Sequence, residues 1–170
     1  GPPPPTIDTV RTMDETEEST TTTDAPPVVN FLQFTHAQLK AGKIPFKDEK
    51  ITERVTYHDP CNISRAGWII EQPREILKHI CANFVEMTPN RSNNYCCGGG
   101  SGFAIMDNSN FPMWRNTLAG RVKLRQILDA FQDVMDPEIK KYVCAPCSNC
   151  KGQIREIFAN YGVFDKCNIL

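Results

Sequence analysis

Two adjacent cysteines followed by three glycines are the part of this chain best suited to metal chemistry. The side chains of Cys96 and Cys97 leave the backbone in different directions, so the pair presents its sulfurs to two neighbouring metal centres more readily than to one tetrahedral ion. Gly98, Gly99 and Gly100 carry no Cβ and allow bare amide N–H groups to approach a bulky anionic group. The sequence therefore predicts a polynuclear cofactor at these cysteines, with the three glycines contributing to its binding.

Further cysteines lie on both sides of this pair. Cys61 ends the sequence His58-Asp59-Pro60-Cys61, and Cys144, Cys147 and Cys150 lie close together nearer the C-terminal end. If these stretches meet in space, they supply more thiolates than the four ligands that one zinc ion needs. We interpret this excess as a sign of several metal atoms, and hence of an iron–sulfur redox site.

A zinc site is the main alternative, in a domain with a structural or interaction role and no redox turnover. The Cys-x2-Cys spacing of Cys147 and Cys150 is the usual half of a structural zinc site. A second half with the same compact spacing is missing, because the other thiols are an isolated Cys61 and a vicinal pair. The spacing also differs from the usual ferredoxin pattern. Zinc is expected to replace iron when the protein is prepared in air.

The composition argues against several other classes of protein. The chain has 170 residues and a formal net charge of -1, so neither nucleic acid nor an anionic membrane surface is expected as a partner. No apolar run approaches the roughly 20 residues needed to cross a bilayer, and no secretory signal opens the chain. Vicinal cysteines do not suit a disulfide framework. We expect a cytoplasmic domain that reaches a membrane only through partner subunits.

Residues 1–27 differ in composition from the rest of the chain. Prolines, threonines and acidic residues dominate this segment, and apolar side chains are almost absent. Such a segment cannot bury enough surface to offset the entropy lost on ordering. We therefore predict a disordered tail or linker at residues 1–27 and one folded domain at residues 28–170.

Within the predicted domain, the apolar pattern alternates between helical and extended segments. Helices are expected at 31–41, from Pro73 onward, at 113–131 and at 148–160, and short strands at 54–57 and 141–143. The helix beginning at Pro73 is expected to bury one face, made of Ile76, Leu77, Ile80, Cys81 and Phe84. The core residues expected in helix 113–131 are Leu118, Val122, Leu124, Ile127, Leu128 and Phe131.

The order of these elements predicts an α/β fold with a small, mostly parallel sheet flanked by helices. In such sheets, sites gather at the carboxyl ends of the strands. Cys61 follows the first predicted strand and Cys144 ends the second. The fold class is therefore expected to bring these distant cysteines together.

The sequence around the cysteines resembles the cysteine-rich CCG domain of heterodisulfide reductase-type catalytic subunits, and most closely the DsrK-like subunit of a sulfite-reduction-associated complex. The resemblance covers about residues 28–165. It implies a noncubane [4Fe–4S] cluster held by five cysteines, with Cys144/Cys147 as the alternative terminal pair. Matched motif by motif, the five are Cys61, Cys96, Cys97, Cys147 and Cys150. The matching motifs are Tyr57-His58-Asp59-Pro60-Cys61, Pro73-Arg74-Glu75-Ile76, Cys96-Cys97-Gly98-Gly99-Gly100-Ser101-Gly102 and Cys150-Lys151-Gly152-Gln153.

The same resemblance implies a thiol–disulfide oxidoreductase that works within a multi-subunit complex. An electron-donor subunit or a membrane cytochrome subunit would supply electrons, and the substrate would be a disulfide of a small protein or a coenzyme. Members of the family usually carry two cysteine repeats, often with a ferredoxin module, whereas this chain has one repeat. We therefore also expect a fragment of a larger protein, a single-domain form, or one half of a site that another chain completes.

Several residues near these motifs have less specific interpretations. His58 is a candidate proton donor, or else it shapes the turn at Asp59-Pro60 through a hydrogen bond. Arg65 and Arg74 either offset the charge of a cofactor, bind a partner's carboxylate, or are solvated surface residues.

Two tryptophans and two further cysteines are the remaining residues for which the sequence suggests a role. Trp68 and Trp114 flank the ligand loops and are expected either to shield the cofactor or to pack in the core. Cys81 is expected in the core, and Cys167 as a free thiol.

Overall fold

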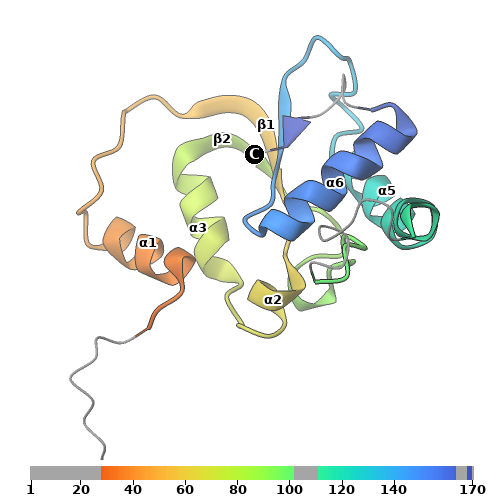
Figure 1. The fold of residues 1–170 in the computed structure, drawn as a ribbon. Helices are drawn as coiled ribbons and strands as arrows, with labels where there is room; N and C mark the ends of the chain where they lie inside the picture. Colours follow the sequence, from red (N-terminus) through yellow and green to blue (C-terminus); the bar gives the residue numbers. More distant parts are fainter. Residues whose placement is uncertain (1–27, 102–110, 164–167, 170) are drawn as a thin grey trace, which may run out of the picture.

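The computed structural model of the chain describes residues 28–101, 111–163 and 168–169. The tail predicted at residues 1–27 and the thiol of Cys167 lie outside the described residues. Figure 1 shows the described elements along the chain. In chain order they are α1 (Phe31–Lys40), β1 (Ile51–Tyr57), α2 (Cys61–Ser64), α3 (Glu71–Ile80), β2 (Cys81–Val85), the 3-10 turn η2 (Arg91–Asn93), the π-helical segment η3 (Trp114–Ala119), α5 (Gly120–Ala130), β3 (Lys141–Cys144), α6 (Ser148–Tyr161) and β4 (Asn168–Ile169).

The ends of the helices follow local signals in the sequence. The side chain of Asn30 caps α1 by accepting a hydrogen bond from the Leu32 amide at 2.9 Å. Pro73 lies in the first turn of α3, where its missing N–H costs no helical hydrogen bond. Gly162 ends α6 in the left-handed conformation, with φ of +63°. Across the described ranges, no helix combines the length and hydrophobicity that a membrane span requires.

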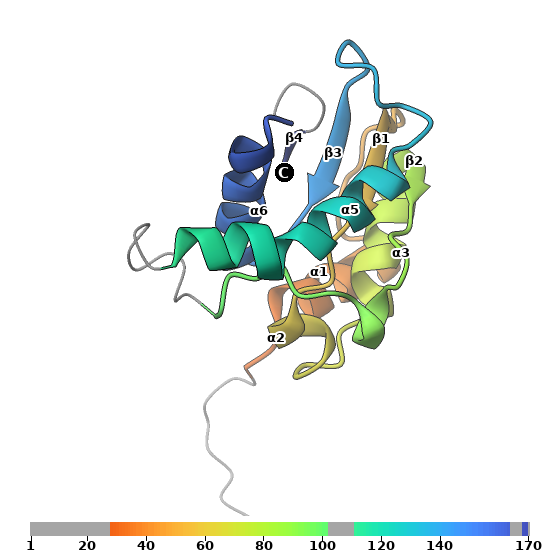
Figure 2. The same cartoon turned by 90° about the vertical axis from the view of Figure 1, so that its right-hand side faces the viewer.

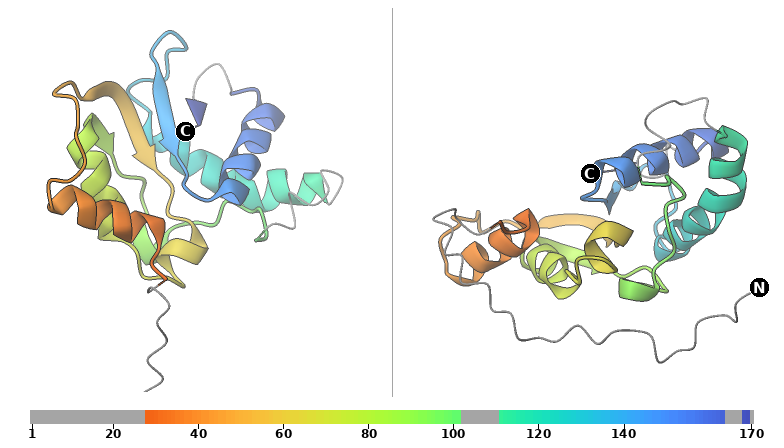
Figure 3. Two further views of the ribbon diagram at one scale, coloured as in Figure 1. Left: turned by 60° about the vertical axis from the view of Figure 1, so that its left-hand side comes forward. Right: turned by 60° about the horizontal axis from the view of Figure 1, so that its bottom comes forward.

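The four described strands run parallel in the order β2-β1-β3-β4. The central pair, β1 and β3, is in register so that Tyr57 lies opposite Cys144. Figure 2 shows α5 crossing one face of the strands, and Figure 3 shows α1 and α3 on the other side of the sheet from α5 and α6. These observations confirm the predicted α/β fold with a small parallel sheet between helices.

Each face of the sheet packs against its own apolar cluster. The side chains of β1 alternate, so Val55 and Tyr57 face α3 while Thr56 faces the opposite layer. The α3 cluster contains Val55, Tyr57, Leu77 and Cys81. The larger cluster lies under α5 and α6 and contains Met87, Cys97, Leu124, Ile127, Phe131, Val143, Ala145, Cys150, Ile154, Ile157, Phe158 and Val163. Two of the cysteines discussed above therefore belong to this core.

The prediction that the helix beginning at Pro73 continues past Ile80 and includes Cys81 and Phe84 is wrong. The helix ends at Ile80, and Cys81 begins β2, which pairs with β1 along its length. Spacing alone cannot separate a helix end from a strand that follows at once, and pairing with β1 decides the conformation of Cys81 and Phe84. The expectation that Cys81 lies in the core is confirmed, because it is 4% exposed.

Leu118 and Val122 were expected in the core, but both are exposed, at 61% and 44%. The buried positions before Leu124 include Gly120 and Asn116, which follow steps of four residues, whereas steps of three would lead to Leu118. Gly120 is the position that approaches α6, since an added Cβ would lie 2.6 Å from Cδ1 of Ile157. The sequence pattern missed this because a glycine and an asparagine occupy the inward positions and the segment is π-helical.

A buried charge network fixes the turn that follows β1. Arg74 of α3 is fully buried and binds both carboxylate oxygens of Asp59 at 2.7 Å. The same guanidinium binds Glu86, at 2.7 and 3.1 Å, and Asp59 also accepts the Arg91 amide at 2.7 Å. The turn leading into Cys61 is therefore held to α3 and to the loop after β2. The prediction that Arg74 is a solvated surface residue is wrong.

Replacing Arg74 with Met is predicted to lower the free energy of unfolding by about 3–5 kcal/mol, because Asp59 is left buried without its cation. Urea unfolding of the metal-free protein measures this change. Arg54→Met is the matched control, because Arg54 also binds a carboxylate through two nitrogens, that of Asp133, but at the surface. We expect a far smaller loss there, and equal losses in the two variants would contradict the buried network as a determinant of stability.

Candidate metal centre

One pocket collects cysteines from three separate stretches of the chain. Its lining consists of Cys61, Asn62, Cys96, Cys97, Gly99, Gly100, Ser101, Cys147, Asn149 and Cys150. The five cysteines that the family resemblance assigns as cluster ligands are all among these residues. The structure thus brings them together, and it places Cys144 outside this lining.

The carboxyl ends of β1 and β3 position two of the three stretches. Cys61 is the first residue of α2, after the turn that follows β1. Cys147 is the N-cap of α6 and Cys150 lies in the first turn of that helix, just after β3. Because β1 and β3 are neighbours in register, these two turns leave the same edge of the sheet. Helix N-terminal turns favour thiolates and other anionic groups.

The pocket has a buried floor and an exposed mouth. Cys97 and Cys150 are both 4% exposed, and their Sγ atoms lie 3.3 Å apart. Cys61 and Cys96 are exposed, and Cys147 is intermediate. The separation of Cys97 and Cys150 is well beyond the roughly 2.05 Å of a disulfide bond, so both are free thiols in this structure.

The glycines after the cysteine pair have different roles. The amides of Gly98 and Gly99 point at the Sγ atoms of Cys96 and Cys97, each at 3.4 Å. Gly99 and Gly100 line the pocket. Gly98 instead packs against η3, with φ of +87°, and an added Cβ there would lie 3.0 Å from Cβ of Ala119. A side chain at this position would push the cysteine loop away from the helix.

Crowding and burial keep the thiols of Cys96 and Cys97 protonated in the absence of metal. The hydrogen bond with Cys150, together with burial, raises the pKa of Cys97 to about 12. The pKa of Cys96 is raised chiefly by its hydrogen bond with Cys97 and then by burial. Any metal that binds these sulfurs must therefore displace protons, because thiolates are the ligands.

Cys144 lies on the other side of β3 from the pocket floor. Its side chain packs against the α3 cluster with Tyr57 and Cys81. Burial raises its pKa to about 11. Its carbonyl oxygen accepts the His58 amide at 2.9 Å, which extends the β1–β3 pairing by one hydrogen bond. Cys144 thus contributes its backbone to the site, whereas Cys147 and Cys150 contribute their side chains to the pocket.

His58 lies beside the floor of the pocket. One of its ring nitrogens and the sulfurs of Cys97 and Cys150 all lie within 4.8 Å of one another. Nδ1 is 3.3 Å from the side-chain nitrogen of Asn94, and Nε2 is buried without a hydrogen-bond partner among the described residues. Burial, and then Lys123, hold the pKa of His58 well below its usual value, so the ring is neutral at neutral pH.

Lys123 of α5 is buried beneath the cysteine loop. Its Nζ donates to Asn94 Oδ1 at 2.7 Å and to Oε1 of Gln126, and it lies 3.9 Å from the Met87 sulfur. Burial lowers its pKa to about 7. The sequence analysis did not identify Lys123 or Asn94 as residues of the site. Lys123 was recognisable, because it lies four residues before Ile127 and therefore on the inward face of the predicted helix.

The remaining sequence candidates lie outside the pocket lining. Arg65 donates to the carbonyls of Ser92 and Asn94, and so holds the loop that leads into Cys96. Trp68 and Trp114 are 71% and 54% exposed, so the expectation that they pack in the core is wrong. Neither tryptophan lines the cysteine pocket.

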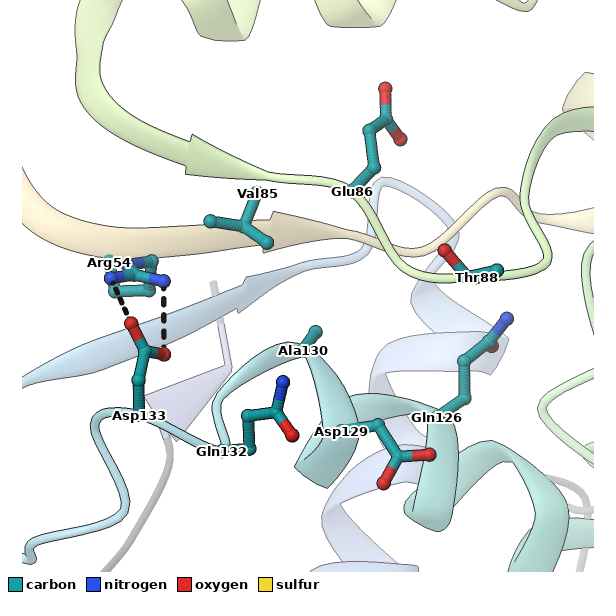
Figure 4. A pocket seen from close by; sticks show the side chains of 9 residues that line it. All are labelled: Arg54, Val85, Glu86, Thr88, Gln126, Asp129, Ala130, Gln132 and Asp133. Atoms are coloured by element: carbon teal, nitrogen blue, oxygen red, sulfur yellow. Dashed lines mark hydrogen bonds and ion pairs between the residues drawn. The ribbon is translucent and has the colours of Figure 1, made fainter.

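A wider pocket lies on the α5 side of β1 and β2, away from the cysteines. It has a volume of about 650 Å³ and is lined by Arg54, Val85, Glu86, Thr88, Gln126, Asp129, Ala130, Gln132 and Asp133. Figure 4 shows the Arg54–Asp133 ion pair at one end of it. Glu86 and Gln126 connect this pocket to Arg74 and Lys123, but no thiol lies in its lining. The metal-binding chemistry therefore belongs to the cysteine pocket.

Comparison with known proteins agrees with this geometry. The model of the CCG family, described as a cysteine-rich domain, matches residues 55–155. The chain is 30% identical over 132 residues to an Hdr-like menaquinol oxidoreductase iron-sulfur subunit of Archaeoglobus profundus, covering 74% of this chain and 22% of that protein. It is 35% identical over 77 residues to iron-sulfur subunit 2 of an Hdr-like menaquinol oxidoreductase of Archaeoglobus fulgidus, covering 44% and 14%.

A third relative belongs to the dihydromethanophenazine:CoB--CoM heterodisulfide reductase of Methanosarcina barkeri. The chain is 37% identical to one polypeptide of that enzyme over 76 residues, which cover 44% of this chain and 18% of the polypeptide. The chain spans less than a quarter of the length of these relatives. No solved structure gave a significant match. The family match encloses all five cysteines of the pocket, and the chain belongs to the family of CCG cysteine-rich domains.

Proposed function

We propose that this domain holds a [4Fe–4S] cluster, of the noncubane type, on Cys61, Cys96, Cys97, Cys147 and Cys150, and exchanges electrons with a thiol–disulfide couple. The observation that carries the proposal is the single pocket that these cysteines share. The iron–sulfur subunits among the relatives support it.

The donor set in the pocket suits such a cluster. Five thiols exceed the four ligands of one tetrahedral ion, and the vicinal pair divides between the buried floor and the exposed mouth. The amides of Gly98 and Gly99, which point at the two cysteine sulfurs, are placed to stabilise negative charge on them. When bound, an iron–sulfur cluster supplies electrons one at a time.

The exposed mouth of the pocket is where we place the substrate. Cys61 and Cys96 are the exposed cysteines of the lining, so a disulfide of a small protein or a coenzyme reaches the site from their side. Reduction of a disulfide to two thiols takes up two electrons and two protons. We propose that His58, whose ring is neutral and lies beside the floor cysteines, hydrogen-bonds a sulfur there through its ring N–H. A role as proton donor to the substrate stays a prediction.

We further propose that the domain works as one part of a redox complex, in the cytoplasm or at the membrane through a partner. An electron-donor subunit or a membrane cytochrome subunit would then deliver the electrons. Tyr95, next to Cys96, and Val122 line one groove together with Arg121 and Arg125. The groove also holds Asp129, which pairs with Arg125, and its exposed Tyr95 and Val122 beside the cysteine loop support a contact with such a partner. The DsrK-like assignment stays a prediction.

A single zinc ion with a structural role is the second candidate. It is favoured by the close group of His58, Cys97 and Cys150, whose ligand atoms lie within 4.8 Å of one another. Zinc binds thiolates and imidazole in such sets. In this case the exposed cysteines would have no redox role.

Iron analysis of protein prepared without oxygen separates the two candidates. We predict about four irons per chain, as a [4Fe–4S] cluster requires, and loss of most of this iron in Cys97→Ser and Cys150→Ser. Cys81→Ser and Cys144→Ser are the matched controls, because both thiols lie in the α3 cluster, and we expect them to retain iron. One zinc and no iron in the wild-type protein would support the structural alternative.

His58→Gln is predicted to retain iron and to slow the single-turnover reduction of a small disulfide by about 10- to 100-fold, because the hydrogen-bond and proton donor beside the sulfurs is removed. Rapid mixing of the reduced protein with the disulfide measures this rate. His36→Gln serves as the control, since His36 pairs with Glu75 between α1 and α3. An unchanged rate in His58→Gln would exclude His58 as the donor, and complete loss of metal would identify it as a ligand.

A further inference from the structure

Lys123 is a buried cation without an ionic partner in the described part of the chain. The groups that receive its hydrogen bonds, Asn94, Gln126 and Met87, are all neutral. Arg74, the buried cation of the neighbouring network, binds two carboxylates instead. Burial of an ammonium group without an ion-pair partner is costly. The nearest carboxylate that acts on Lys123 is that of Asp59, which is already bound by Arg74.

Two hydrogen bonds determine how Asn94 is oriented, one from Lys123 and one to the Asp59 carbonyl. An ammonium group has only donors, so the Asn94 atom that it approaches must be the carbonyl oxygen Oδ1. The amide nitrogen of Asn94 then faces the Asp59 carbonyl at 2.6 Å and Nδ1 of His58 at 3.3 Å. Because that nitrogen is a donor, Nδ1 of His58 is the acceptor.

This orientation places the hydrogen of His58 on its other ring nitrogen. A neutral imidazole that accepts at Nδ1 carries its proton on Nε2. Nε2 is the buried atom for which the described residues provide no partner. The ring lies within 4.8 Å of the sulfurs of Cys97 and Cys150, so the group bound by these cysteines is the acceptor at hand.

We infer that Lys123 is a positioning residue which, through Asn94, presents the Nε2–H of His58 to the sulfur centre, and whose charge stabilises the reduced, more negative state of that centre. The inference rests on the proposed function, since it concerns the same pocket. It also bears on the zinc alternative. A histidine that ligates through Nε2 donates from Nδ1 to an acceptor, whereas here Nδ1 faces an amide donor.

The first test uses metal-free protein and needs no cluster. Nitrogen-15 NMR of the imidazole rings at pH 6, where Lys123 carries its charge and the His58 ring is still neutral, is expected to show His58 as the Nε2–H tautomer. His58→Gln assigns its signals among the three histidines. Lys123→Met removes one of the two groups that orient Asn94, so the tautomer preference is expected to weaken. A wild-type Nδ1–H tautomer, or an unchanged preference in Lys123→Met, would overturn the link through Asn94.

The second test measures the midpoint potential of the iron-loaded protein by redox titration. Lys123→Met and Lys123→Gln, which lack the charge, are expected to have more negative midpoints, whereas Lys123→Arg retains the charge and is expected to stay near wild type. Lys141→Met is the matched control, because Lys141 is also buried but binds carbonyls at the opposite end of β3. Unchanged midpoints in both neutral variants would overturn the charge effect.

If Lys123→Met and Lys123→Gln do not bind iron, their potentials cannot be titrated, and the iron content of each variant becomes the measurement. If they lose iron while Lys123→Arg and Lys141→Met keep it, the charge at position 123 is needed for the bound centre, as the inference states. Loss of iron in Lys123→Arg as well would overturn a charge effect in favour of packing. Failure of the wild-type protein to bind iron would instead contradict the proposed function, and the two failures are thereby distinguishable.

Discussion

The parallel pairing of β1 with β3 is the constraint on which the site depends. Tyr57 lies opposite Cys144, and one further hydrogen bond, from the His58 amide to the Cys144 carbonyl, continues the ladder past the end of β1. α2 follows β1 and α6 follows β3, so the cysteine-bearing N-termini of these two helices leave the sheet side by side. If β3 slipped by one residue relative to β1, its side chains would turn to the other face of the sheet, so Tyr57 and Cys144 would no longer share a face. The pocket cysteines that follow the two strands would then move apart.

Two buried cations fix the loops that strand pairing does not hold in place. Arg74 ties Asp59 to the loop after β2, and Lys123 ties Asn94 to α5. Both arrangements act on the backbone within two residues of a pocket cysteine, and neither requires a metal to form. Their energetics differ, however. The carboxylates around Arg74 neutralise it within the fold, whereas Lys123 has only neutral partners and gains most when negative charge enters the pocket.

The sequence predicted the parts of this arrangement that are encoded locally. The strands before Cys61 and Cys144, the helices at 31–41 and 148–160, and the core role of Cys81 follow from short patterns of polarity and turn residues. It failed where long-range contacts decide, as at β2, whose conformation depends on pairing with β1. It failed too at the junction of η3 and α5, where Gly120 rather than Leu118 approaches α6. The networks of Lys123 and Asn94 were not predicted, because hydrogen bonds between residues distant in sequence leave no periodic signal.

The site also shows why thiol number alone does not decide between zinc and a cluster. Two floor thiols and an imidazole lie close enough to hold one ion, and the two mouth thiols are exposed to water. The distinction comes from the atoms behind them. Since Lys123 orients Asn94 to donate toward Nδ1 of His58, the ring is held as a hydrogen-bond donor toward the sulfurs rather than as a ligand. A pocket with a cation and an N–H donor directed at its sulfurs stabilises added negative charge, and a centre that accepts electrons benefits from this more than a zinc ion, whose charge does not change.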